Sequence, residues 1–175
     1  MTAFQTFTAG QILTASQVSA LQANSTAVAI FQDQKTSGTS GGNASTGSFV
    51  KRTLNTTVVN NIAACSISSD VVTLTAGTYF ITANATFYRV NSFQLRLQNT
   101  TAGTTLATGL SLLADTDDAN GDVQIGFLNG YITLTGSTNL ELQYRAATNL
   151  NTNSLGVACS FGTEVYATLT IQQVA

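Results

Sequence analysis

Strand-like segments separated by turn residues run along the chain from Thr26 onward, and this pattern restricts the fold more than any other feature. The segments are rich in Val, Ile, Leu, Thr, Tyr and Phe, whereas Gly, Ser, Asn and Asp separate them. About ten strands at short spacing are the signature of an antiparallel sandwich or jelly roll. We expect strands within residues 26–34, 49–59, 63–68, 71–90, 92–100, 105–114, 122–135, 139–148 and 163–174.

Two of these segments predict a sheet with one dry face and one wet face. Phe93, Leu95 and Leu97 alternate with polar residues, and segment 139–145 alternates in the same way. Strict alternation of this kind is typical of a half-buried antiparallel strand.

Three other segments, 77–90, 122–134 and 164–173, carry large apolar residues on both faces. A sandwich buries one face of each sheet, so we expect another copy of the chain to cover the second face. The alternative is a set of isolated surface aromatics, which need no partner. The predicted interface residues are Phe80, Tyr88, Leu128 and Tyr166.

The charge pattern argues against nucleic-acid binding and against a membrane-spanning segment. The chain of 175 residues has a net charge of −2 and only 8% charged residues, compared with about 25% in an ordinary soluble domain. Its six Lys and Arg residues are scattered, so no basic stripe faces a phosphate backbone. We expect no signal peptide and no membrane insertion, because neither a charged and apolar leader nor a long apolar run is present.

The first residues differ from the strand-rich remainder, which divides the chain into an arm at 1–25 and a domain at 26–175. Thr14 stands where an N-cap belongs, ahead of a short helix with a thin apolar stripe. Such a short helix is marginal alone, so we expect the arm to anchor on another protein. Its predicted apolar anchors are Phe4, Phe7, Ile12, Val18 and Leu21.

Several segments resemble known families. Segment 71–90 resembles the strand-turn-strand signature of the complement and tumour-necrosis-factor-like jelly-roll superfamily, and segment 161–173 resembles its closing strand. The pieces "KTSGTSGG", "KRTLNT" and "YRVNSFQLRLQNTT" are similar to the globular module of bacteriophage tail-fibre and other virion surface proteins. The opening "FTAGQILTASQVSALQ" is similar to a segment with which many phage tail proteins begin.

The resemblance covers about residues 26–175. It implies an all-β, ten-strand jelly roll that assembles as a homotrimer, with the inner sheets meeting around the threefold axis. The chain departs from the tail-fibre pattern in length, since it has no long shaft.

The side chains give little support to enzymatic chemistry. The chain contains no His, so imidazole bases and the usual catalytic triads are unavailable. Glycan cleavage needs two opposed carboxylates, and no such pair is evident from the strand pattern. We therefore expect a protein that is not an enzyme and needs no cofactor.

An acidic stretch, residues 115–122, has two interpretations. Asp118, Asn120 and Asp122 alternate, with Gly121 permitting a tight turn, and such oxygen ligands suit calcium. The spacing does not match an EF-hand. A solvated acidic turn between two strands is the favoured interpretation, and a calcium site is the alternative.

Cys65 and Cys159 lie far apart, and neither belongs to a paired motif. Two buried free thiols are the favoured interpretation, and a disulfide is the alternative.

Two functions fit these expectations. The first is a trimeric knob on a phage tail appendage, whose loops at 36–48, 115–122 and 147–160 bind a host surface glycan or protein. The second is a capsid decoration (cement) trimer that the N-terminal arm anchors to the head. Both place the protein in the virion, after synthesis in the cytoplasm of the bacterial host, and both make it contact other virion proteins through residues 1–25.

Overall fold

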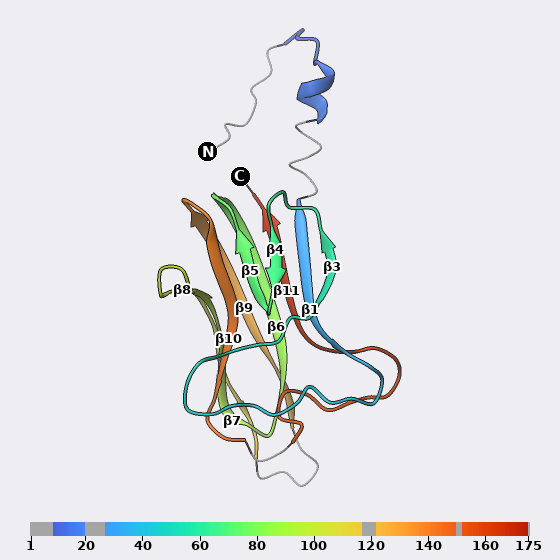
Figure 1. The fold of residues 1–175 in the computed structure, drawn as a ribbon, viewed down its shortest axis with the longest axis vertical. Helices are drawn as coiled ribbons and strands as arrows, with labels where there is room; N and C mark the ends of the chain where they lie inside the picture. Colours follow the sequence, from blue (N-terminus) through green and yellow to red (C-terminus); the bar gives the residue numbers. More distant parts are fainter. Residues whose placement is uncertain (1–8, 20–26, 117–121, 150–151, 175) are drawn as a thin grey trace.

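The computed structural model describes residues 9–19, 27–116, 122–149 and 152–174. In these residues two antiparallel sheets pack face to face (Figure 1). Their strands are β1 (Val28–Lys35), β2 (Val50–Lys51), β3 (Thr56–Asn60), β4 (Ser66–Ser68), β5 (Val71–Leu74), β6 (Gly77–Tyr88), β7 (Asn91–Asn99), β8 (Thr104–Ala114), β9 (Val123–Leu134), β10 (Thr138–Ala146) and β11 (Glu164–Gln173).

The strand order defines a jelly roll. The five-stranded sheet runs β3-β1-β11-β6-β9, and the six-stranded sheet runs β4-β5-β10-β7-β8, with β2 also pairing with β10. Chain neighbours therefore tend to lie in different sheets, as the Greek-key connections of a jelly roll require.

The described residues hold eleven strands, where the sequence pattern predicts ten. The predicted segment 49–59 divides between the sheets, because β2 pairs with β10 and β3 pairs with β1. The residues between them cross from one sheet to the other, and Arg52 and Leu54 are buried there.

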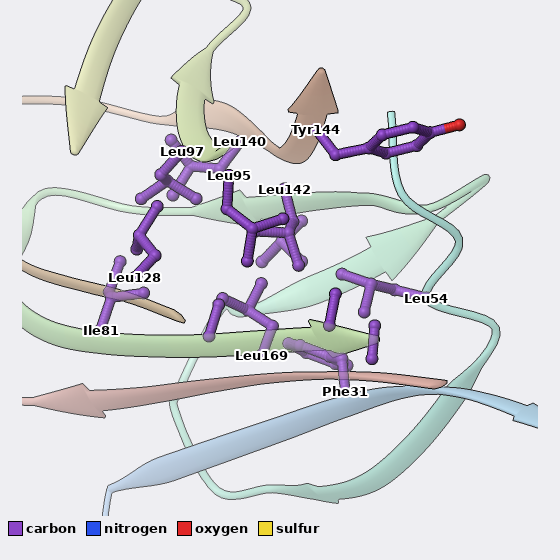
Figure 2. Close-up of a cluster of buried hydrophobic side chains, with 14 of the residues drawn as sticks. Phe31, Leu54, Ile81, Leu95, Leu97, Leu128, Leu140, Leu142, Tyr144 and Leu169 are labelled. Atoms are coloured by element: carbon purple, nitrogen blue, oxygen red, sulfur yellow. The ribbon is translucent and has the colours of Figure 1, made fainter. Parts of the chain in front are cut away.

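The core lies between the two sheets and explains the clean alternation of β7 and β10. Leu95, Leu97 and Leu142 from the six-stranded sheet face Ile81 and Leu169 from the five-stranded sheet (Figure 2). Burying a side chain of this size stabilises the fold by about 1.5–3 kcal/mol each.

Aromatic side chains extend the core. The Phe87 ring stacks on Phe93 with centroids 4.2 Å apart, and Tyr144 lies 5.7 Å from Phe87 in a tilted arrangement.

Glycines let the two sheets meet along the edge formed by β8 and β9. A Cβ on Gly109 would lie 2.5 Å from the Phe127 carbonyl oxygen, and one on Gly130 would lie 2.9 Å from the Ala107 Cβ. Contacts below 3.0 Å force a shift of the backbone, so side chains at these two positions would push the sheets apart.

The predicted helix is present at residues 15–19. Thr14 caps it, since the Gln17 amide donates to Thr14 Oγ1 (3.3 Å) and the Thr14 amide donates to Gln17 Oε1 (2.9 Å). These reciprocal bonds form a capping box. Among the described residues, no helix has the length and hydropathy needed to cross a membrane.

Candidate functional site

The outer face of β6 and β9 carries a row of large apolar side chains. In the register of this pair, Phe80 lies opposite Tyr131, and Phe127 lies opposite Asn84. The exposed fractions are 41% for Phe80, 47% for Phe127 and 67% for Tyr131. We call this surface the β6–β9 apolar face, and its members are Phe80, Val123, Ile125, Phe127 and Tyr131.

This face is distinct from the outer surface of the rest of the same sheet. On β1 and β11 the outward row has no exposed aromatic ring. It consists of Gln and Thr with Val28, Ile30 and Val165, and Gln32 Nε2 donates to Thr168 Oγ1 (3.2 Å). The exposed aromatic rings therefore gather at one edge of the five-stranded sheet, where β9 is the last strand. A contiguous exposed apolar patch of this kind marks an interaction surface.

Phe80 lies on the outward face of β6, as the sequence pattern predicts. Tyr88 shares that face and is half-buried, with its backbone amide bonded to the Ser154 carbonyl oxygen (2.9 Å). Their role in a subunit interface stays a prediction.

The predicted outward position of Leu128 is wrong. Leu128 is 1% exposed and belongs to the core cluster in Figure 2. The inward row of β9 contains Gly126 and Gly130, and side chains from neighbouring strands fill the space beside these glycines. Because of the two glycines, the outward row of β9 has more large apolar residues than the inward row. Assigning the larger apolar set to the core therefore reverses the two faces of this strand.

The prediction that a neighbouring subunit covers Tyr166 is also wrong, because the chain's own loops cover it. Tyr166 is 4% exposed, and its ring lies against the backbone at Gly41 and Gly156. Its hydroxyl donates to the Thr39 carbonyl oxygen (2.8 Å). A Cβ on Gly156 would lie 2.1 Å from the ring, so glycine is required for this packing.

Two of the predicted recognition loops lie together. Loop 36–48 runs beside the segment that leads into β11 (Figure 1), and the Gly41 amide donates to the Gly156 carbonyl (3.0 Å). The Leu155 amide donates in turn to the Gly42 carbonyl (3.0 Å). Most of the third predicted loop, 115–122, lies outside the described residues.

Glu164 fastens these two loops to the start of β11. Its carboxylate accepts from the backbone amides of Cys159 (3.1 Å), Ser160 (2.7 Å) and Gly38 (3.1 Å). These bonds, led by that of Cys159, lower the pKa of Glu164 from its ordinary value. In the loop that these bonds hold, the side chain of Phe161 is 99% exposed to solvent.

A buried ion pair under the same loops has no counterpart in the sequence predictions. Arg52 and Asp33 are both 0% exposed, and Arg52 Nη2 lies 3.5 Å from Asp33 Oδ2. Arg52 Nη2 also donates to the carbonyl oxygens of Leu155 (2.9 Å) and Tyr166 (3.1 Å). Burial lowers the pKa of Arg52, although Asp33 opposes that effect. The pair joins four segments that are distant in the chain.

The two cysteines are free thiols in different environments. Cys65 is buried, and burial raises its pKa to about 11. Cys159 is exposed, which corrects the expectation of two buried thiols.

The described part of the arm exposes its apolar residues. Ile12 and Val18 are both solvent-exposed. Phe4, Phe7 and Leu21 lie outside the described residues, so their predicted anchoring role is not placed.

The proposed calcium ligands Asp118 and Asn120 also lie outside the described residues. Asp122 accepts from Gln124 Nε2 (2.8 Å). Within the described ranges, no three Cys, Asp or Glu side chains gather as a metal site would require.

Comparison with known proteins identifies the fold. No family model matches the sequence, and no curated protein is significantly similar to it. Murine APRIL at pH 5.0 has a similar structure, with a TM-score of 0.54 and 13% identity over 83% of this chain and 97% of that chain. The globular domain of zebrafish complement 1qA protein gives a TM-score of 0.51 with 13% identity over 85% of this chain and 97% of that chain. The chain therefore has the jelly-roll fold of the tumour-necrosis-factor and complement C1q domains.

Proposed function

We propose that the chain is a non-enzymatic structural protein of a phage virion that assembles as a homotrimer and binds the host surface. The observation that carries the proposal is the β6–β9 apolar face, which a lone subunit leaves in contact with water. The jelly-roll fold supports trimer assembly through this sheet. The resemblance of the N-terminal segment to phage tail proteins supports a location in the virion.

Assembly through this face follows from its position at the edge of the sheet. Three copies related by a threefold axis would each place β9 against the sheet of a neighbour, so that Phe80, Phe127 and Tyr131 become buried. Aromatic side chains dominate the energetics of such interfaces because each removes a large apolar area from water. The six-stranded sheet would then face outward.

The absence of enzymatic chemistry is part of the proposal, and it is supported by the positions of the acidic side chains. Glu164 accepts three backbone hydrogen bonds, and Asp33 is paired with Arg52. Asp70 Oδ1 accepts from the Leu54 amide (2.9 Å). Each of these three carboxylates is therefore engaged by groups of the chain itself.

Two measurements test the proposal. Sedimentation equilibrium of the purified full chain should give three times the subunit mass of 18.2 kDa, and a stable single subunit at micromolar concentration would contradict it. Added recombinant trimer should block adsorption of the phage to its host. Unchanged adsorption, together with a high copy number on the head and fragile heads, would favour a capsid decoration protein.

A further inference from the structure

An open groove of about 790 Å³ lies on the six-stranded sheet, which is the sheet opposite the β6–β9 apolar face. Strands β7, β8 and β10 form its floor, and Gly47 lies at its side, where the Gly47 amide donates to the Ala146 carbonyl oxygen (3.3 Å). A volume of this size is typical of small-molecule sites.

Three polar side chains stand in one row across the floor of the groove. Arg145 on β10 lies opposite Gln94 on β7, and Gln94 lies opposite Ser111 on β8. Gln94 Nε2 donates to Ser111 Oγ (3.0 Å) and to the Gly109 carbonyl oxygen (3.1 Å), which fixes the orientation of the amide. The adjacent row adds the Ser92 hydroxyl beside the apolar Leu113, which is 57% exposed.

Arg145 is the cation that the described residues leave without a partner. Its neighbour Arg96 donates to Gln143 Oε1 (2.8 Å) and lies 4.1 Å from the centroid of the Phe49 ring. The remaining cations, Lys35, Lys51, Arg52 and Arg89, each make a hydrogen bond or an ion pair. Arg145 makes neither with any described residue, and no Asp or Glu among the described residues lines the groove.

The chemistry of this groove suits an anionic ligand with many hydroxyl groups. A guanidinium binds a carboxylate through two parallel hydrogen bonds. Serine hydroxyls and an oriented amide exchange hydrogen bonds with hydroxyl groups, and Leu113 offers a surface for the C–H face of a sugar ring. A single cation does not match the repeated charges of a nucleic acid.

We propose that this groove binds a saccharide that carries a carboxylate, with Arg145 pairing with the carboxylate and with Ser92, Gln94 and Ser111 bonding to the sugar hydroxyls. The proposal rests on the proposed function, because it names the ligand class of the binding module. Trimer assembly through the five-stranded sheet leaves three such grooves open, so weak sites would combine on a polymeric glycan.

Isothermal titration calorimetry of the full chain tests the site with two pairs of probes. Trigalacturonate is compared with its methyl ester, and 3′-sialyllactose is compared with its methyl ester, so that each pair differs only in the charge of the carboxylate. At least one acidic sugar should bind about tenfold or more tightly than its neutral partner, since charge-assisted hydrogen bonds have this magnitude. The pair that shows the preference identifies the source of the carboxylate.

Variants then locate the binding. Arg145→Gln should weaken binding of the acidic sugar about tenfold to a hundredfold, and Leu113→Asp, which places a carboxylate in the groove, should also weaken it. Lys51→Gln is the matched control, because it removes one positive charge outside the groove lining, and it should leave the affinity unchanged.

Several results would overturn the proposal. They are equal binding within both probe pairs, equal losses in Arg145→Gln and Lys51→Gln, and tighter binding of a hexaglutamate peptide than of either sugar. Sedimentation equilibrium measures the oligomeric state of the same samples. If the protein is a trimer that blocks adsorption but binds no acidic sugar, the proposed sugar site is contradicted and the proposed function stands. If a single subunit binds the sugar through Arg145, the proposed trimer is contradicted and the sugar site stands.

Discussion

Phe80 on β6 lies directly opposite Tyr131 on β9, and both rings are exposed on the side of the sheet that faces away from the core. Aromatic cross-strand pairs stabilise a sheet, but here they leave two rings in contact with water. The pair therefore forms one end of the surface that we assign to subunit assembly, and Phe127 lies at its middle.

Replacing Phe127 with Asp should dissociate the trimer. A charge at the centre of a desolvated interface costs more than the lost apolar contact, and truncation of such an aromatic alone costs about 2 kcal/mol or more. Sedimentation velocity at a series of concentrations would show the shift toward single subunits. Leu113→Asp is the control, because it makes a similar change on the opposite sheet and should leave the trimer intact.

The buried pair of Arg52 and Asp33 should show strong coupling. Asp33→Leu alone leaves the buried charge of Arg52 without compensation, which costs about 3–5 kcal/mol. Arg52→Met alone leaves Asp33 with only the partly exposed Lys35 (3.4 Å) as an ion-pair partner among the described residues. The double variant Asp33→Leu/Arg52→Met removes both charges and should be more stable than either single variant. Urea unfolding monitored by circular dichroism measures these free energies, and additive losses would show that the pair is not coupled.

The carboxylate of Glu164 should make the two loops sensitive to acid. Its pKa in the folded state lies below the ordinary value of 4.5. The stabilisation is therefore complete above that ordinary value and is lost as the pH falls through the lower folded value. The amide resonances of Cys159 and Ser160 should titrate with a midpoint below 4.5, and Glu164→Gln should abolish this titration. A midpoint above 4.5 would contradict the prediction.

The two thiols should react at different rates. Cys159 is exposed, whereas Cys65 is buried and burial raises its pKa to about 11. At pH 8 a thiol reagent should label one equivalent rapidly and the second only after unfolding, because the thiolate is the reactive form. Cys159→Ser should remove the rapid phase, while rapid labelling that persists in this variant would show that Cys65 is accessible.

Much of the fold could be predicted from the sequence, because the alternation of apolar and polar residues along a strand indicates which side chains are buried. The alternating pattern places the inward residues of β7 and β10 and the outward Phe80 correctly, and the sequence also places the N-cap at Thr14. The N-cap was predictable because a capping side chain acts within one helical turn.

The sequence misled where contacts between distant segments decide the outcome. On β9 the residues filling the space beside Gly126 come from other strands, so the strand's own pattern assigns its faces in reverse. The loops that cover Tyr166 lie far from it along the chain. Arg52 looks like any other surface cation, and nothing near it in the sequence signals its burial beside Asp33.

The position of β11 has a consequence for biosynthesis. It is the last strand in chain order, yet it lies between β1 and β6 in the five-stranded sheet. While the ribosome is still adding residues 164–173, both of those strands present unpaired edges, which are templates for aggregation. A nascent chain should therefore depend on chaperones until this strand emerges, and a premature stop codon before residue 164 should yield insoluble product.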